Sequence, residues 1–115
     1  MLKSDVYQKE LIKLTEIFAD VEDNKKKLVE GCIEDAAFLF AENYELKNLL
    51  SISGMVKIHP QYPDIQKPLE TAKQYLKNVN AYSIVIKTLN GVLQKNTIEA
   101  DDEFDEFIQG MNKHE

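Results

Sequence analysis

The segment Gly54-Met-Val-Lys-Ile-His-Pro-Gln-Tyr-Pro-Asp-Ile-Gln-Lys-Pro68 separates two long helical patterns in a chain of 115 residues. It contains all three prolines of the protein. Its glycine is expected to end the preceding helix as a left-handed residue after the C-cap. The residues before Pro60 and Pro63 are pushed away from helical geometry. We therefore predict an extended, proline-containing joint over residues 54–68.

Two helices are predicted before this joint. Apolar residues recur every three or four positions over about residues 5–20, and the pattern resumes over 24–53 after a polar break. The two helices are expected to form a helical hairpin. Gly31 lies inside the second pattern and predicts a close helix crossing or a kink. The single cysteine, Cys32, is interpreted as a small core residue of a protein in a reducing cytoplasm.

A third and longer helix is predicted from about residue 65 to residue 95. Its apolar residues follow a heptad spacing, namely Ala72, Tyr75, Val79, Tyr82, Ile86, Leu89 and Leu93. Such a helix is about 45 Å long, so we expect part of it to pack on another subunit. The predicted fold is therefore all-α, with a helical domain over residues 1–98. Residues 99–115 are expected to form a flexible, acidic C-terminal tail that is disordered when free.

Charge divides the chain into three parts. Residues 1–64 hold twelve acids and eight lysines, whereas residues 65–98 hold five lysines and one acid. The tail, residues 99–115, holds seven acids and one lysine. There is no arginine, which excludes the bidentate reading of guanine by arginine. The basic third helix is thus expected to present a different electrostatic surface from the acidic first half and the acidic tail.

Catalytic and metal-binding patterns are missing from the sequence. The only histidines are His59 and His114, and no His/Cys cluster or Gly-rich phosphate loop accompanies them. His59 is interpreted as a structural residue held by the turn that Pro60 enforces. No apolar run approaches the roughly 18 residues of a membrane span. We therefore expect a non-enzymatic protein without a metal, a cofactor or a membrane segment.

A family resemblance rests on the order of several features. Gly54 ends a helical pair, the His59-Pro60 step follows a short extended piece, and the helix Tyr75-Leu-Lys-Asn-Val-Asn-Ala-Tyr-Ser-Ile-Val-Ile-Lys-Thr-Leu89 precedes the acidic tail. Over about residues 25–108 the chain resembles the small terminase subunits of tailed phages of Gram-positive bacteria, in their short all-helical group. Such a subunit binds double-stranded viral DNA, assembles into a homo-oligomeric ring and recruits the large ATPase and nuclease subunit in the host cytoplasm.

The resemblance implies roles for three groups of residues. Phosphate contacts are expected from the lysines Lys25, Lys26, Lys27, Lys73, Lys77 and Lys87. The oligomer interface is expected along the heptad seam, through Tyr75, Val79, Tyr82, Ile86, Leu89 and Leu93. Docking on the large subunit is expected from three apolar residues of the tail, Phe104, Phe107 and Ile108.

Each assignment has a plainer alternative. The lysines are also typical of a solvated helix face, the seam of an internal core, and the tail of a solubilising terminus. In another interpretation the tail folds back on the basic third helix and masks it. The chain as a whole also fits a small, monomeric helical interaction protein, of which bacteriocin immunity proteins are an example.

Overall fold

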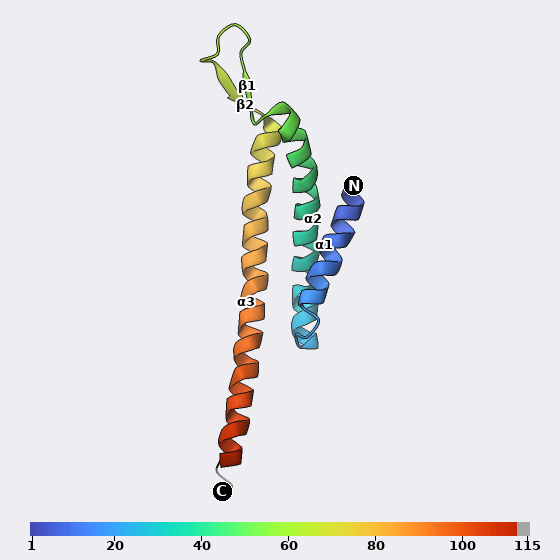
Figure 1. The fold of residues 1–115 in the computed structure, drawn as a ribbon, viewed down its shortest axis with the longest axis vertical. Helices are drawn as coiled ribbons and strands as arrows, with labels where there is room; N and C mark the ends of the chain where they lie inside the picture. Colours follow the sequence, from blue (N-terminus) through green and yellow to red (C-terminus); the bar gives the residue numbers. More distant parts are fainter. Residues whose placement is uncertain (113–115) are drawn as a thin grey trace.

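The computed structural model describes the backbone of residues 1–112 and the side chains of residues 1–95, Glu106 and Gln109. The described chain is mostly helical, as predicted, with one small pair of strands between the second and third helices (Figure 1). The elements are α1 (Lys3–Ile17), α2 (Asp23–Ser53), β1 (Val56–Ile58), β2 (Gln66–Pro68) and α3 (Glu70–Asn112). α2 begins and ends within one residue of the prediction, whereas α1 begins two residues earlier and ends three residues earlier than predicted.

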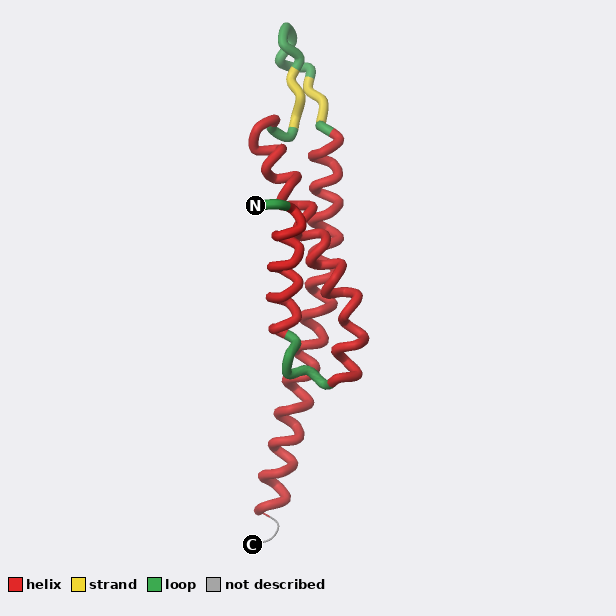
Figure 2. The backbone as a smooth tube through the Cα atoms, turned by 90° about the vertical axis from the view of Figure 1, so that its right-hand side faces the viewer, coloured by secondary structure: helices red, strands yellow, loops and turns green. Residues whose placement is uncertain are grey.

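The helices form a long hairpin with a third helix on its side. α2 and α3 run antiparallel, α1 packs against α2, and the molecule measures 85 × 30 × 19 Å (Figure 1). The strands project from one end, and α3 continues past the α1–α2 turn at the other end (Figure 2). The two ends of the molecule therefore carry different elements.

The core lies where all three helices meet. Its buried side chains come from α1, the α1–α2 turn, α2 and α3, namely Leu14, Phe18, Val21, Val29, Ile33, Ala36 and Leu89. Burial of each large apolar side chain contributes on the order of 1.5–3 kcal/mol. Cys32 packs at the edge of this cluster, half-buried, as an apolar residue would. The expected close crossing at Gly31 is wrong, because that residue is exposed and a Cβ there would meet nothing within 4 Å.

Gly54 ends α2 with a positive φ angle. Its φ is 75° and its ψ is 174°, and its N–H donates to the Leu50 carbonyl at 2.8 Å. The positive φ was predicted, but the ψ value lies outside the left-handed helical region, in a region that only glycine enters readily. The backbone therefore leaves α2 extended and enters β1 directly.

The joint is a β-hairpin, whereas the sequence predicts only an extended segment. Residues 56–58 pair antiparallel with residues 66–68, and a seven-residue loop, 59–65, connects them. This pairing also corrects the start of the third helix. Residues 66–68 hydrogen-bond to β1, so α3 begins at Glu70 instead of about residue 65.

The end of the third helix is corrected too. α3 continues through Asn112 instead of ending near residue 95, so the described backbone of residues 99–112 is helical where a flexible tail is predicted. A tail folded back on α3 is also wrong over these residues, since they continue the same helix. Residues 113–115 lie outside the described part of the chain.

Candidate functional site

Lys57 and Lys67 lie directly opposite each other in the β-hairpin. The flanking hydrogen bonds run from Leu69 N–H to the Met55 carbonyl at 3.2 Å and from His59 N–H to the Ile65 carbonyl at 3.0 Å. Bonded and non-bonded pairs alternate in an antiparallel ladder, so the two lysines form a hydrogen-bonded pair with Cα atoms about 5.5 Å apart. Both side chains therefore extend from the same face of the ribbon.

No described acid forms an ion pair with either of these two ammonium groups, and the one acid of the hairpin, Asp64, lies in the loop that joins its strands. Among the described residues, neither side chain has an ion-pair or hydrogen-bond partner, and both are exposed. Like charges directly opposite on a strand pair destabilise it, on the scale of about 0.2–1 kcal/mol for such pairs. An anion held between the two groups would remove that repulsion.

The loop at the tip of the ribbon is ordered by its own hydrogen bonds. His59 Nδ1 accepts from the N–H groups of Gln61 at 3.1 Å and Tyr62 at 3.2 Å, and the His59 and Tyr62 rings lie 5.2 Å apart. Ile65 N–H donates to the Tyr62 carbonyl at 2.9 Å. Because Nδ1 accepts, the neutral ring carries its proton on Nε2. His59 thus organises the turn, as the sequence predicts.

Three candidate lysines of α3 lie on one exposed face of the helix. At 3.6 residues per turn, Lys73, Lys77 and Lys87 fall within a sector of about 80°, and all three are exposed. Lys73 pairs with Glu70 at 3.1 Å, which is the last acid before Glu99. The outward side of α3 therefore carries a row of lysines from residue 73 to residue 87, with the exposed Ile84 between Lys77 and Lys87.

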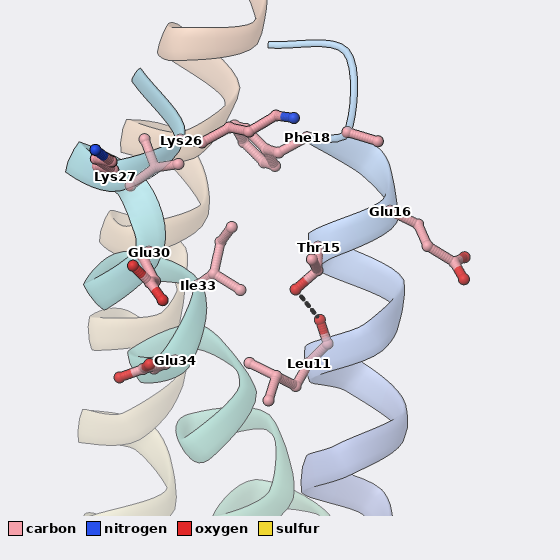
Figure 3. A pocket seen from close by; sticks show the side chains of 11 residues that line it. Leu11, Thr15, Glu16, Phe18, Lys26, Lys27, Glu30, Ile33 and Glu34 are labelled. Carbon is pink, nitrogen blue, oxygen red and sulfur yellow. Dashed lines mark hydrogen bonds between the residues drawn. The ribbon is translucent and has the colours of Figure 1, made fainter. Parts of the chain in front are cut away.

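The lysines at the start of α2 lie in a different setting. Lys26 and Lys27 line an open cleft of about 560 Å³ between α1 and α2 (Figure 3). Its apolar wall includes Leu11, Phe18, Val29 and Ile33. Glu16, Glu30 and Glu34 also line it, although the Glu16 carboxylate points away from the cleft (Figure 3). Lys25 is half-buried, and Lys26 lies 3.9 Å from Asp23. Acids thus flank this run of lysines, which weakens its positive potential.

The heptad seam packs inside the chain. Leu89 is only 2% exposed in the three-helix core, and Tyr82, Ile86 and Leu93 pack against that core. Tyr75 and Val79, with Tyr82, face α2 across a small pocket of about 160 Å³. All six seam residues therefore lie on the side of α3 that contacts α2. Within the single chain, Leu89 thus belongs to the internal core, Tyr82, Ile86 and Leu93 pack at its edge, and Tyr75 and Val79 line the pocket beside α2. An oligomer interface through the seam stays a prediction.

A polar cluster closes the contact between the three helices. The Phe40 and Tyr82 rings lie 6.2 Å apart, and the Lys13 ammonium sits 5.6 Å from the Phe40 ring centre. Glu10, 5% exposed, has an Oε1 without a well-aligned hydrogen bond, so the ion pair with Lys13 at 2.8 Å compensates its burial. The Glu10 contact raises the pKa of Lys13, while burial, reinforced by Glu10, raises the pKa of Tyr82.

The large-subunit docking candidates fall in the C-terminal part of α3. The backbone at Phe104, Phe107 and Ile108 is helical, but their side chains lie outside the described part of the structure. Their spacing still places them on one helical face by sequence.

The sequence interpretation missed Lys57 and Lys67. A signal was present, because Val-Lys-Ile and Gln-Lys-Pro are equidistant from Tyr62 and frame a loop with two prolines. Two short segments symmetric about a turn are typical of a hairpin.

Comparisons with protein families, with curated proteins and with solved structures gave no match for this chain. Within the described residues, no helix is both long and apolar enough to cross a membrane. Over the same residues no group of three or more histidines, cysteines and acids is placed to hold a metal ion.

Proposed function

We propose that the chain is a non-enzymatic DNA-packaging protein of the small terminase type, acting in the host cytoplasm. In this role it binds double-stranded viral DNA, associates with itself and recruits the large ATPase and nuclease subunit. The proposal rests first on the order of Gly54, the His59-Pro60 step, the basic third helix and the acidic tail.

The basic face of α3 is the observation that carries the proposal. Lys73, Lys77 and Lys87 are exposed on one side of the helix, and residues 71–95 contain no acid. Clustered lysines on one face favour contacts to a phosphate backbone, which supply most of the affinity in sequence-independent DNA binding. This charge arrangement supports a polyanion as partner despite the net charge of −6 of the whole chain.

We propose that self-association uses a surface other than the seam, because the seam faces α2 within the chain. The outward face of α2 offers one, because Phe38, Leu49 and Ile52 are exposed there, with Ile52 at 87%. Their spacing places them within about 60° on the helix. The acidic segment with Phe104, Phe107 and Ile108 remains the proposed contact for the large subunit, a mode in which an amphipathic helix lies in an apolar groove.

DNA binding and oligomeric state test this function together. The full-length chain is expected to bind a 60-base-pair duplex at about 50 mM salt, with an affinity that falls steeply as salt rises. Light scattering is expected to give the molar mass of an oligomer. Changing Lys73, Lys77 and Lys87 together to Gln should lower affinity, whereas Lys9→Gln with Lys47→Gln should not. A monomer that binds no DNA at that salt concentration would overturn the proposal.

A small monomeric interaction protein is the second candidate. Two observations favour it, namely the heptad seam that is satisfied inside the chain and the open apolar cleft between α1 and α2. In that case the chain is monomeric, and a partner protein contacts the cleft wall near Leu11 and Ile33. Thr15→Arg, which fills the cleft from its exposed rim, would then abolish partner binding and leave any DNA binding unchanged.

A further inference from the structure

We propose that the β-hairpin of residues 55–68, with Lys57 and Lys67 side by side on one face, enters the major groove of double-stranded DNA. This inference rests on the proposed DNA-binding function and names a contact element for it. The lysines of α3 and α2 expected from the sequence are not part of this element.

The dimensions of the ribbon fit a groove. A two-stranded antiparallel ribbon is one of the two elements that the major groove admits. Three-residue strands alone rise about 10 Å at about 3.3 Å per residue, which exceeds the roughly 8.5 Å depth of the groove. All residues of the hairpin are exposed, and it projects beyond the ends of α2 and α3 (Figures 1 and 2). No other element of the described chain blocks its approach.

The charge on the ribbon selects an anionic partner. Lys57 and Lys67 are held about 5.5 Å apart at their Cα atoms by the ladder, and no described acid pairs with either side chain. Lysine is a donor to the acceptors of guanine in the major groove and to phosphate oxygens. Two adjacent ammonium groups thus match adjacent acceptors on one duplex.

The tip of the ribbon is organised before it binds. His59 Nδ1 accepts two backbone hydrogen bonds within the loop, and the Tyr62 carbonyl accepts a third from Ile65. The loop therefore loses little conformational entropy on binding. Gln61 lies within this turn with its side chain exposed, and its amide suits the acceptor and donor pair of adenine.

The experiment compares full-length variants on a 60-base-pair duplex. Lys57→Gln with Lys67→Gln removes the two charges, Lys57→Arg with Lys67→Arg keeps them, and Lys9→Gln with Lys47→Gln is the control of equal charge change. Each lysine in contact should contribute about one unit to the slope of log affinity against log salt. Between 50 and 200 mM salt, the affinity of the Lys57/Lys67→Gln variant should then fall about tenfold less than that of the wild type per bound chain.

Chemical protection of guanine N7 locates the contact. The wild type and the arginine variant should protect guanines in the major groove, and the glutamine variant should lose that protection while its circular dichroism and melting temperature stay native. If the wild type binds DNA and the glutamine variant keeps the same salt slope and the same guanine protection, the hairpin does not enter the major groove. The proposed DNA-binding function would still stand in that case. A wild type that binds no DNA would overturn both.

An anionic membrane surface is the other polyanion that the lysine pair could bind, and a vesicle experiment distinguishes it from DNA. Binding to vesicles of phosphatidylserine and phosphatidylcholine, lost in the glutamine variant and accompanied by no duplex binding, would assign the lysine pair to a lipid surface and overturn the DNA proposal.

Discussion

The rings of Phe40 on α2 and Tyr82 on α3 lie 6.2 Å apart and are tilted by 48°, with the Lys13 ammonium 5.6 Å from the Phe40 ring centre. Side chains from all three helices therefore meet at one point on the seam of α3. The Tyr82 ring contributes to the packing between the helices there, so substitutions of Tyr82 are expected to change the free energy of unfolding.

Tyr82→Ala should lower the free energy of unfolding by about 1–3 kcal/mol, because it removes a half-buried ring from the helix interface. Urea denaturation followed by circular dichroism measures this change. Tyr62→Ala is the matched control at the exposed tip of the hairpin, and it should change stability by no more than about 0.5 kcal/mol. Equal effects of the two substitutions would show that the Phe40–Tyr82 contact contributes nothing.

Stability should fall in alkaline solution partly through Tyr82. Burial raises the pKa of Tyr82 above its ordinary value of 10.0, with Glu10 adding to the shift and Lys13 opposing it. A raised folded-state pKa gives stability that is complete below the unfolded pKa of about 10 and is lost as pH rises through the folded pKa. Tyr82→Phe should therefore show a shallower loss of stability above about pH 10 than the wild type.

Urea titrations at several alkaline pH values measure this difference, with Tyr62→Phe as the control. The contact with Glu10 also raises the pKa of Lys13, so the stability that this ion pair contributes is likewise lost as pH rises. Glu10 and Lys13 are present in the wild type and in Tyr82→Phe, so this loss is expected in both proteins. Identical pH profiles for Tyr82→Phe and the wild type would contradict the prediction.

Asn43→Leu should stabilise the protein by about 1 kcal/mol. Asn43 is 8% exposed, and its Oδ1 has no hydrogen-bond partner beside the small pocket between α2 and α3. An unsatisfied buried acceptor costs free energy that an apolar side chain of similar size does not. Asn78→Leu is the control, because the Asn78 amide oxygen accepts from Gln74 at 2.8 Å. A lower melting temperature for Asn43→Leu would indicate an ordered water on Oδ1.

Two glycine-to-alanine substitutions should act with opposite signs. Gly54→Ala should destabilise the chain by about 1–3 kcal/mol, because its φ of 75° and ψ of 174° are reached readily only by glycine. Gly31→Ala should stabilise it by about 0.5–1 kcal/mol, since Gly31 lies in a helix and a Cβ there meets nothing within 4 Å. Thermal melts measure both, and a shared sign would contradict the assignment of the Gly54 backbone.

The helices were predictable from the sequence because periodicity reports which face is buried. The spacing of Leu14 and Phe18 placed α1, and the spacing of Tyr82 and Leu89 placed the buried face of α3. Periodicity does not report which surface covers that face, so the same seam fitted a second subunit as well as α2. In the structure this face lies against α2, because the β-hairpin between α2 and α3 turns the chain back so that the two helices run side by side.

The β-hairpin was harder to predict because its strands are three residues long and pair only with each other. Strand signals depend on several alternating residues, and the prolines of this segment are typical of loops. The end of α3 was misplaced because high acidity was interpreted as disorder, although glutamate is a good helix former. The pairing of Lys57 with Lys67 depends on the register of the two strands, and the spacing of residues in the sequence does not determine that register.

The distance between the β-hairpin and the C-terminal end of α3 has an electrostatic consequence. These features lie at opposite ends of a molecule 85 Å long (Figure 1), whereas the Debye length at 0.1 M salt is about 10 Å. The acids of residues 99–106 are therefore screened from whatever meets the hairpin. A chain with net charge −6 can approach a polyanion with one end while the other end attracts cations. The total charge and the isoelectric point of the chain therefore predict neither the interaction at the hairpin end nor the interaction at the acidic end.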